Sequence, residues 1–260
     1  MSIFNIGKRN VLYYPGCLTK YVLKAELDNY RKILNKIGVD FIMLLNELCC
    51  GSPALNAGYE TEGIKLARKN LEIFKQHKIS KIITACPACF KTFSSYKEML
   101  PDWDIEVEHI CITILNYLKK KNIYYETRKK ATYHDPCHLG RHSGTYQEPR
   151  EVLNRLGYAL VEMKNNRENA LCCGGGAGLK ANNPELADKI AKERIKQAKN
   201  IGVSTIITTC PLCFSHMDEN SAEVEVLEFS WVVADALGLK PEKTTREKII
   251  KEEKVVEAFS

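Results

Sequence analysis

The sequence lacks the features that would place the chain in a bilayer, outside the cell or on nucleic acid. Its apolar runs are far shorter than the ~18 residues that a membrane-spanning helix needs, and its first residues lack the basic and apolar segments of a secretion signal. Lysine and arginine outnumber aspartate and glutamate by 38 to 32, but they form no long basic block. We therefore expect a cytoplasmic protein with no integral membrane segment and no nucleic-acid partner, associated with a membrane only through partner subunits.

Cysteine is too scarce for a disulfide scaffold and too frequent to be incidental. The chain has 260 residues, which favours one or two domains, and it contains 11 cysteines. That is about 4% of the residues, against ~8–10% in small disulfide-rich proteins. In a reducing compartment, clustered cysteines are more typical of metal ligands or redox centres.

Ten of the cysteines fall into two sets with the same pattern. The spacings are C-x31-CCG-x34-CPxC and C-x34-CCG-x35-CPxC, which indicates an internal duplication with an offset of about 120 residues. The first set comprises Cys17, Cys49, Cys50, Cys86 and Cys89, and the second comprises Cys137, Cys172, Cys173, Cys210 and Cys213. Cys111 stands outside both sets on an apolar stretch, where we expect a buried, inert thiol.

The two repeats predict two folded units joined by a charged linker near residues 121–131. We place the first cysteine-rich unit at residues 1–125, the second at 126–239, and a charged C-terminal helical tail at 240–260. The tail alternates charged and sparse apolar residues, and it lies outside the duplication.

Apolar periodicity in each half predicts alternating strands and helices. In order, we expect strand 11–14, helix 23–37, strand 40–45, helix 62–77 and strand 81–85, then strand 131–134, helix 148–156, strand 160–163, helix 184–200 and strand 205–209. The β-α-β-α-β order, repeated, predicts an α/β protein of two pseudo-repeated Rossmann-like units, each with a mainly parallel sheet.

This fold would bring the cysteines of each set together. They follow the carboxyl ends of predicted strands, which meet at one edge of a parallel sheet and face the N-termini of the next helices. The prolines after Cys86 and Cys210 suit a helix start. The glycines after each cysteine pair, Gly51 and Gly174, would let backbone N–H groups approach sulfur.

Five thiols with an adjacent pair favour a large iron–sulfur cluster. Zinc takes four ligands, usually from two CxxC segments, and a cubane cluster commonly uses a CxxCxxC run that this chain lacks. Zinc in one half and regulatory disulfides remain as alternatives.

The second half carries the segments HDPCHLGR at 134–141, NREN at 166–169 and CCGGG at 172–176. With the two cysteine sets, these residues resemble the CCG-domain (cysteine-rich domain) iron–sulfur proteins, over about residues 10–238. That family includes the heterodisulfide reductase catalytic subunit and iron–sulfur subunits of glycolate and lactate oxidation. The resemblance implies a noncubane [4Fe-4S] cluster in each half, and a disulfide cleaved between the two by successive one-electron transfers.

The chain contains no ferredoxin-like CxxCxxCxxxCP run, which larger members of that family have. Its electrons are therefore expected from a ferredoxin-like iron–sulfur subunit and a flavoprotein subunit. Disulfide reduction within such a complex is the favoured function. The alternatives are electron relay in a complex that oxidises a 2-hydroxy acid such as glycolate or lactate, and a zinc- or cluster-stabilised scaffold without catalysis.

Four histidines accompany the second set and are candidates for proton delivery. His134, His138 and His142 surround Cys137 in the sequence, and His216 follows Cys213 by one helical turn. The alternative is that their imidazoles donate hydrogen bonds to sulfur or cap loops. The glycine-rich segment 174–178 lacks the lysine and serine or threonine of a phosphate-binding loop, so we expect a tight turn around the cluster.

Overall fold

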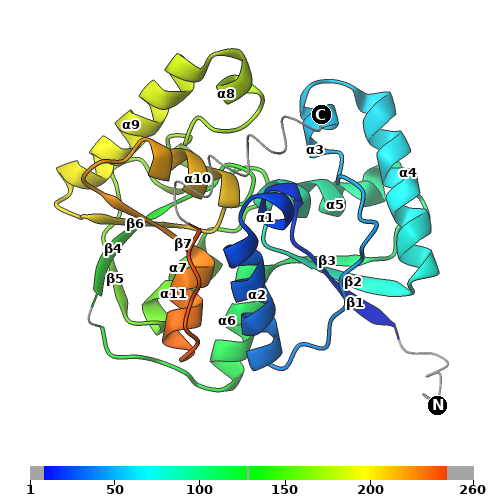
Figure 1. Ribbon diagram of the computed structural model, residues 1–260, viewed down its shortest axis with the longest axis horizontal. Coiled ribbons are helices and arrows are strands. Elements are labelled where there is room, and N and C mark those ends of the chain that lie inside the picture. Colours follow the sequence, from blue (N-terminus) through cyan, green and yellow to red (C-terminus); the bar gives the residue numbers. More distant parts are fainter. Residues whose placement is uncertain (1–8, 128, 245–260) are drawn as a thin grey trace.

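The computed structural model describes residues 9–127 and 129–244, here called the first and second halves, and each half contains one parallel β-sheet (Figure 1). The first sheet has the order β1-β2-β3 and the second β5-β4-β6-β7, and every strand pair is parallel. The strands are β1 (Asn10–Tyr14), β2 (Ile79–Thr84), β3 (Glu106–His109), β4 (Lys129–His134), β5 (Tyr158–Leu160), β6 (Thr205–Thr208) and β7 (Glu225–Glu228). The predicted α/β fold of two repeated units is confirmed.

Helices follow the strands in both halves, and the longest predicted ones are present. In the first half they are α1 (Cys17–Tyr21), α2 (Lys24–Lys36), α3 (Ser52–Asn56), α4 (Glu60–Gln76), α5 (Pro87–Met99) and α6 (Ile110–Lys120). In the second half they are α7 (Gln147–Arg155), the 3₁₀ turn η1 (Arg167–Asn169), α8 (Leu179–Asn182), α9 (Pro184–Asn200), α10 (Pro211–Glu219) and α11 (Phe229–Ala236).

The predicted strand at 40–45 is wrong. Only Ile42 forms a bridge, to Leu12 of β1, and the chain then turns at residues 45–46 with Leu45 almost fully exposed. Phe41 and Met43 pack, partly buried, against one core cluster, and Ile42 and Leu44 pack against another. Their alternation therefore resembles that of a strand, although the segment forms no ladder of strand hydrogen bonds. The bridge occupies the place beside β1 that β5 occupies beside β4. Strand β5 itself lies earlier than predicted, since its pairing begins at Tyr158 opposite Lys129.

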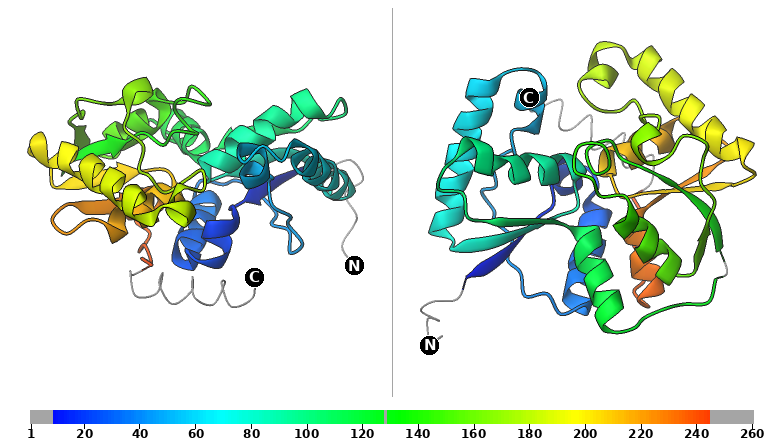
Figure 2. Two further views of the ribbon diagram at one scale, coloured as in Figure 1. Left: turned by 90° about the horizontal axis from the view of Figure 1, so that it is seen from above. Right: turned by 180° about the vertical axis from the view of Figure 1, so that it is seen from behind.

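Four helices separate the two sheets and form a core shared by both halves (Figures 1 and 2). Helix α2 packs against α11, and α6 packs against α7. Tyr30 and Ile114 of the first half and Val152 and Phe229 of the second are all fully buried in this core. Helices α4 and α9 lie on the outer sides of the molecule. Each half therefore completes its inner face against the other.

Two buried carboxylates lie in the shared core, and each is hydrogen-bonded across it. Tyr30 of α2 donates from its hydroxyl to Glu228 Oε1 at 2.6 Å. Trp231 of α11 donates from Nε1 to Glu26 Oε1 at 2.9 Å, and Thr244 donates to the same carboxylate. Burial raises the pKa of Glu228 to about 7. Because buried carboxylates are costly without partners, these bonds link the halves tightly.

The C-terminal tail predicted at 240–260 lies mostly outside the described residues, and the described part, through Thr244, is not helical. The helix there stays a prediction, as do the three domain boundaries. In the part of the chain that the structure describes, no helix has the length and apolar character needed to span a bilayer.

Candidate functional site

The first cysteine set lies at the carboxyl edge of β1 and β2. Cys17 begins α1, Cys86 is the N-cap of α5, and Cys89 lies in the first turn of α5. Between β1 and α1, Gly16 has a φ of +82°, and a Cβ there would lie 3.0 Å from Cys86 Cβ and 3.4 Å from Cys89 Sγ. Glycine is therefore required for the loop that carries Cys17 to approach the CPxC segment.

The five thiols of the first set lie close enough to affect one another's ionisation. Hydrogen bonds from Cys49 and Cys89 hold the pKa of Cys50 well below its usual range. The same bonds raise the pKa values of Cys49 and Cys89. Burial and then the nearby Cys86 and Cys50 raise the pKa of Cys17. The thiols of this group are therefore coupled, so that ionising one of them disfavours ionising its neighbours.

The second set is arranged in the same way beyond β4 and β6. The Sγ atoms of Cys173 and Cys213 are hydrogen-bonded to each other at 3.1 Å. Hydrogen bonds from Cys137 and Cys173 lower the pKa of Cys172, and one from Cys213 lowers that of Cys210. The structure therefore brings all ten predicted ligands together, five in each half. Their role as ligands stays a prediction.

The glycine after each cysteine pair has a left-handed conformation and donates to sulfur. Gly51, with φ +83°, donates its N–H to Cys49 Sγ at 3.4 Å, and Gly174, with φ +85°, does the same to Cys172 Sγ at 3.4 Å. A Cβ on Gly174 would lie 2.6 Å from the carbonyl oxygen of Ala187. The two turns have the same conformation and the same hydrogen bond to sulfur, but the chain packs more closely around Gly174 than around Gly51.

Each thiol group fits a cationic cofactor. Five adjacent sulfurs cannot all ionise without repelling one another, and bound iron or zinc would remove that repulsion while taking thiolates as ligands. All eleven cysteines are free thiols. Cys111 is fully buried in α6, and its Sγ lies 3.1 Å from Nδ1 of His109.

A buried ion cluster holds the loop that carries Cys137. Arg150 of α7 bonds both oxygens of Asp135, at 2.6 and 2.8 Å, and its Nε lies 2.6 Å from Glu162. The backbone N–H of Arg167 also donates to Asp135, at 2.9 Å. The HDPC and NREN segments are thus joined directly through the hydrogen bond between Arg167 and Asp135. We did not predict Arg150 as a site residue, since α7 gives no sign in sequence of what its polar face contacts.

His138 lies where the two halves meet. Its Nδ1 is 3.4 Å from Cys137 Sγ, and its Nε2 is 3.4 Å from Nδ2 of Asn56 in the first half. Its pKa is lowered by burial and then by His142, while Cys172 of the second set and Cys50 of the first oppose this shift. His138 is therefore close to both cysteine sets.

The other three histidines are placed differently. His134 is fully buried, and its Nδ1 accepts a hydrogen bond from Nε of Arg194 at 3.1 Å. Burial and then Arg194 lower the pKa of His134 to about 3. His216 is also fully buried and packs against Gly175, whereas His142 is exposed.

Solvent reaches the two cysteine sets unequally. Cys17 and Cys49 of the first set are exposed, whereas every cysteine of the second is buried or half-buried. Asn56 and His138 mark the boundary between the sets. The first set is therefore the more accessible to a small molecule.

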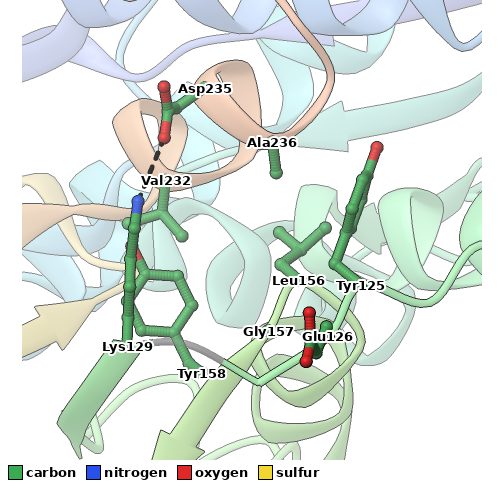
Figure 3. Close-up of a pocket in the computed structure, with 9 residues that line it drawn as sticks. All are labelled: Tyr125, Glu126, Lys129, Leu156, Gly157, Tyr158, Val232, Asp235 and Ala236. Carbon is green, nitrogen blue, oxygen red and sulfur yellow. Dashed lines mark hydrogen bonds and ion pairs between the residues drawn. The ribbon is translucent and has the colours of Figure 1, made fainter.

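A hollow of about 250 Å³ lies at the amino ends of the strands of the second sheet, opposite the end that carries the cysteines (Figure 3). Its lining includes Lys129 and Tyr158, which begin β4 and β5, and Lys129 Nζ is 3.2 Å from Asp235 of α11. No cysteine of the described residues lines it, and it faces the amino ends of the strands. It is therefore separate from the candidate site.

Comparisons with known proteins agree with the duplication. A family model described as CCG, cysteine-rich domain, matches residues 11–94 and 131–218. One subunit of a dihydromethanophenazine:CoB–CoM heterodisulfide reductase from Methanosarcina acetivorans is 36% identical over 248 residues, which are 90% of this chain and 61% of that protein.

Two further relatives have other names. One subunit of a fumarate reductase (CoM/CoB) from Methanothermobacter marburgensis is 29% identical, over 83% of this chain and 43% of that protein. An EtfAB:quinone oxidoreductase from Syntrophomonas wolfei is 31% identical, over 87% and 34% respectively. The chain thus spans between 34% and 61% of the length of these three relatives.

Proposed function

The chain belongs to the CCG cysteine-rich domain family, and from this premise we propose that it is the iron–sulfur subunit of an oxidoreductase complex that reduces a disulfide. The coarser part, an iron–sulfur redox role, is supported by relatives with three different oxidoreductase names. The finer part, disulfide reduction, is supported chiefly by His138, which contacts Cys137 of the second set and Asn56 of the first half and so links the surroundings of the two thiol groups.

The ten cysteines would hold two [4Fe-4S] clusters, noncubane by family resemblance, which when bound supply electrons one at a time. The net reaction adds two electrons and two protons to one S–S bond and releases two thiols. Two sites in one chain match this stoichiometry.

The residues at the boundary would receive the substrate. Cys17 and Cys49 leave the first site open to solvent, which favours contact with a small molecule over pure electron relay. Of the four histidines, His138 alone has contacts in both halves among the described residues, so we assign to it the position next to the substrate sulfurs.

We propose further that the electrons come from a ferredoxin-like iron–sulfur subunit and a flavoprotein subunit. The described residues contain two thiol groups and no third cysteine cluster that could accept electrons from outside. Purification of the complex from its native host would identify the donor. A flavin-dependent hydroxy-acid oxidase in its place would support the relay function instead.

The ligand assignment is tested by removing one site at a time. Anaerobically reconstituted protein should be brown and contain about eight iron atoms per chain, with matching acid-labile sulfide. Cys172→Ser should lose the second cluster and keep the first, and Cys49→Ser should do the reverse, so each variant retains about half of the iron. Cys111→Ser is the matched control and should keep all of it.

Two outcomes would overturn the proposal. Folded wild-type protein that takes up zinc and no iron would support the scaffold instead. Unchanged iron in Cys172→Ser would disprove the ligand set. If iron binds as expected, anaerobic assays with a mixed disulfide of two different thiols and a reduced viologen dye would then separate disulfide reduction from relay, because a relay subunit reduces no disulfide.

A further inference from the structure

The fully buried guanidinium of Arg194 lies beside the second cysteine set. Its Nε donates to Nδ1 of His134 at 3.1 Å, and its Nη1 donates to the carbonyl of Asn165 at 2.6 Å and to Oε1 of Gln197 at 2.8 Å. Its Nη2 is buried and finds no acceptor among the described residues. A buried, unpartnered N–H of a cation is costly, so this group is expected to have an anionic neighbour that the protein alone does not supply.

The contact with Arg194 fixes which nitrogen of His134 carries the proton. A guanidinium can only donate, so Nδ1 must accept with its lone pair, and the neutral ring then bears its hydrogen on Nε2. Nε2 is likewise buried without a partner in the part of the chain that is described. A ring nitrogen of His134 and the Sγ atoms of Cys173 and Cys213 all lie within 4.8 Å of one another.

This geometry argues that His134 donates to sulfur and does not bind metal. Ligation through Nε2 would need a lone pair on that atom, and hence a proton on Nδ1, where Arg194 already donates. The three groups that resemble a metal site, His134, Cys173 and Cys213, are therefore two sulfurs and a hydrogen-bond donor.

The first half has neutral residues at both corresponding places. Tyr14 ends β1 as His134 ends β4, and its hydroxyl donates to the carbonyl of Leu48 at 2.8 Å. Asn70 is the eleventh residue of α4, as Arg194 is of α9, and both helices have 17 residues.

The amide of Asn70 donates to the carbonyl of Cys49 at 2.9 Å and to the hydroxyl of Tyr96 at 3.2 Å. In the first half, Tyr14 and Asn70 therefore donate their hydrogen bonds to oxygen atoms, and neither side chain carries a charge. The corresponding donors of the second half carry one positive charge and lie close to sulfur.

We propose that Arg194 and His134 are positioning residues that make the second site the stronger electron acceptor of the two. An N–H donor and a buried positive charge favour the reduced, more negative form of a sulfur-ligated cluster. At equilibrium, an electron shared between the two clusters would then reside mainly on the second cluster. The first cluster would pass electrons to the substrate. This inference rests on the proposed function, because it requires a cluster at each site.

The first experiment needs no cluster. In metal-free protein, ¹⁵N NMR of the histidine rings should show His134 as the Nε2–H tautomer, with His142 as an exposed control that exchanges between forms. In Arg194→Gln, the His134 signals should move toward a mixture of tautomers. A Nδ1–H tautomer in the wild type would overturn the donor assignment, whether or not iron binds.

The second experiment measures the potential of the second site alone, in a Cys49→Ser background that is reconstituted with iron and sulfide. Arg194→Gln should lower the midpoint potential, so that the ratio of reduced to oxidised cluster at a fixed potential falls about tenfold, which is ~59 mV for one electron. Arg194→Lys keeps the charge and should stay within about twofold of the parent ratio, a rescue that a purely structural role would not require.

The controls separate this inference from the proposed function. Asn70→Leu, at the corresponding place in the first half, should leave the midpoint of the second site unchanged. If Arg194→Gln fails to fold, His134→Phe removes the other donor, the Nε2–H of the imidazole, and should also lower the midpoint potential. An unchanged midpoint with intact iron overturns the inference. Absence of iron from the wild type overturns the proposed function, and the tautomer result still decides the role of His134.

Discussion

The two halves have the same framework but are stabilised by different chemistry. The last paired row of the first sheet contains Tyr14, Thr84 and His109, and the same row of the second contains His134, Thr208 and Glu228. The central threonine is the same in both rows, and both of its neighbours differ. Duplication therefore kept the cysteines and the backbone turns, while the groups around them diverged.

The two halves differ in the charge of the side chains around the cysteines and in the exposure of the cysteines to solvent. Around the first set, neutral side chains bond to backbone carbonyls and two cysteines are exposed. Around the second, Arg150 and Arg194 are buried and no cysteine is exposed. Equivalent substitutions in the two halves should therefore have unequal effects, which makes each half a control for the other.

The largest difference in stability between the halves is expected from removing Arg150, the cation of the buried ion cluster in the second half. Arg150→Met would leave Asp135 and Glu162 without their partner, and breaking a buried ion pair in this way costs about 3–5 kcal/mol. In the first half, Lys20→Met removes the ion pair with Glu47, whose carboxylate is also buried, but only one carboxylate loses its partner there, so a smaller cost of about 1–3 kcal/mol is expected. Chemical denaturation of metal-free protein measures both. Equal shifts would contradict the view that the Arg150 cluster stabilises its half more strongly than the Lys20–Glu47 pair stabilises the other.

A second comparison concerns the residues that cap α6 and α11, which have opposite pH responses. Burial lowers the pKa of His109 to about 4 and raises that of Glu228 to about 7. The contribution of His109 to stability is present above pH ~6.5 and lost as pH falls through 4. That of Glu228 is present below pH ~4.5 and lost as pH rises through 7.

Between pH 4.5 and 6.5 the two trends oppose each other in the wild type. Relative to it, Glu228→Gln should lose stability more steeply as pH falls, and His109→Asn should lose it more steeply as pH rises. Each effect is at most about 3 kcal/mol. Free energies of unfolding across this pH range provide the measurement, and parallel curves for both variants would refute the assignment.

The smallest difference should separate the two CCG turns. Gly51→Ala and Gly174→Ala both force alanine into a left-handed conformation, at about 1–2 kcal/mol each. Only at Gly174 would the new Cβ also overlap a backbone oxygen, 2.6 Å away, whereas the nearest atom at Gly51 is 3.7 Å away. Gly174→Ala should therefore be the less stable by about 1–3 kcal/mol. Thermal unfolding of the pair decides this, and the reverse order would count against the tighter packing of the second turn.

Residues with strong local signals were predictable from the sequence. Helix α9 has the predicted bounds, because Pro184 starts it and its apolar period is regular. Strands β3 and β7 were missed, because the segments EVEH and EVLE are short and half charged. The contact of Arg194 with His134 joins residues sixty positions apart, and no local pattern encodes such a distance.

The core between the sheets has a consequence for synthesis on the ribosome. Helix α2 leaves the ribosome long before its packing partner α11, and Tyr30 reaches Glu228 only when both are present. The apolar side of α2 must therefore stay uncovered until α11 has been synthesised. A nascent chain would expose that surface throughout this interval, and so would either half expressed without the other.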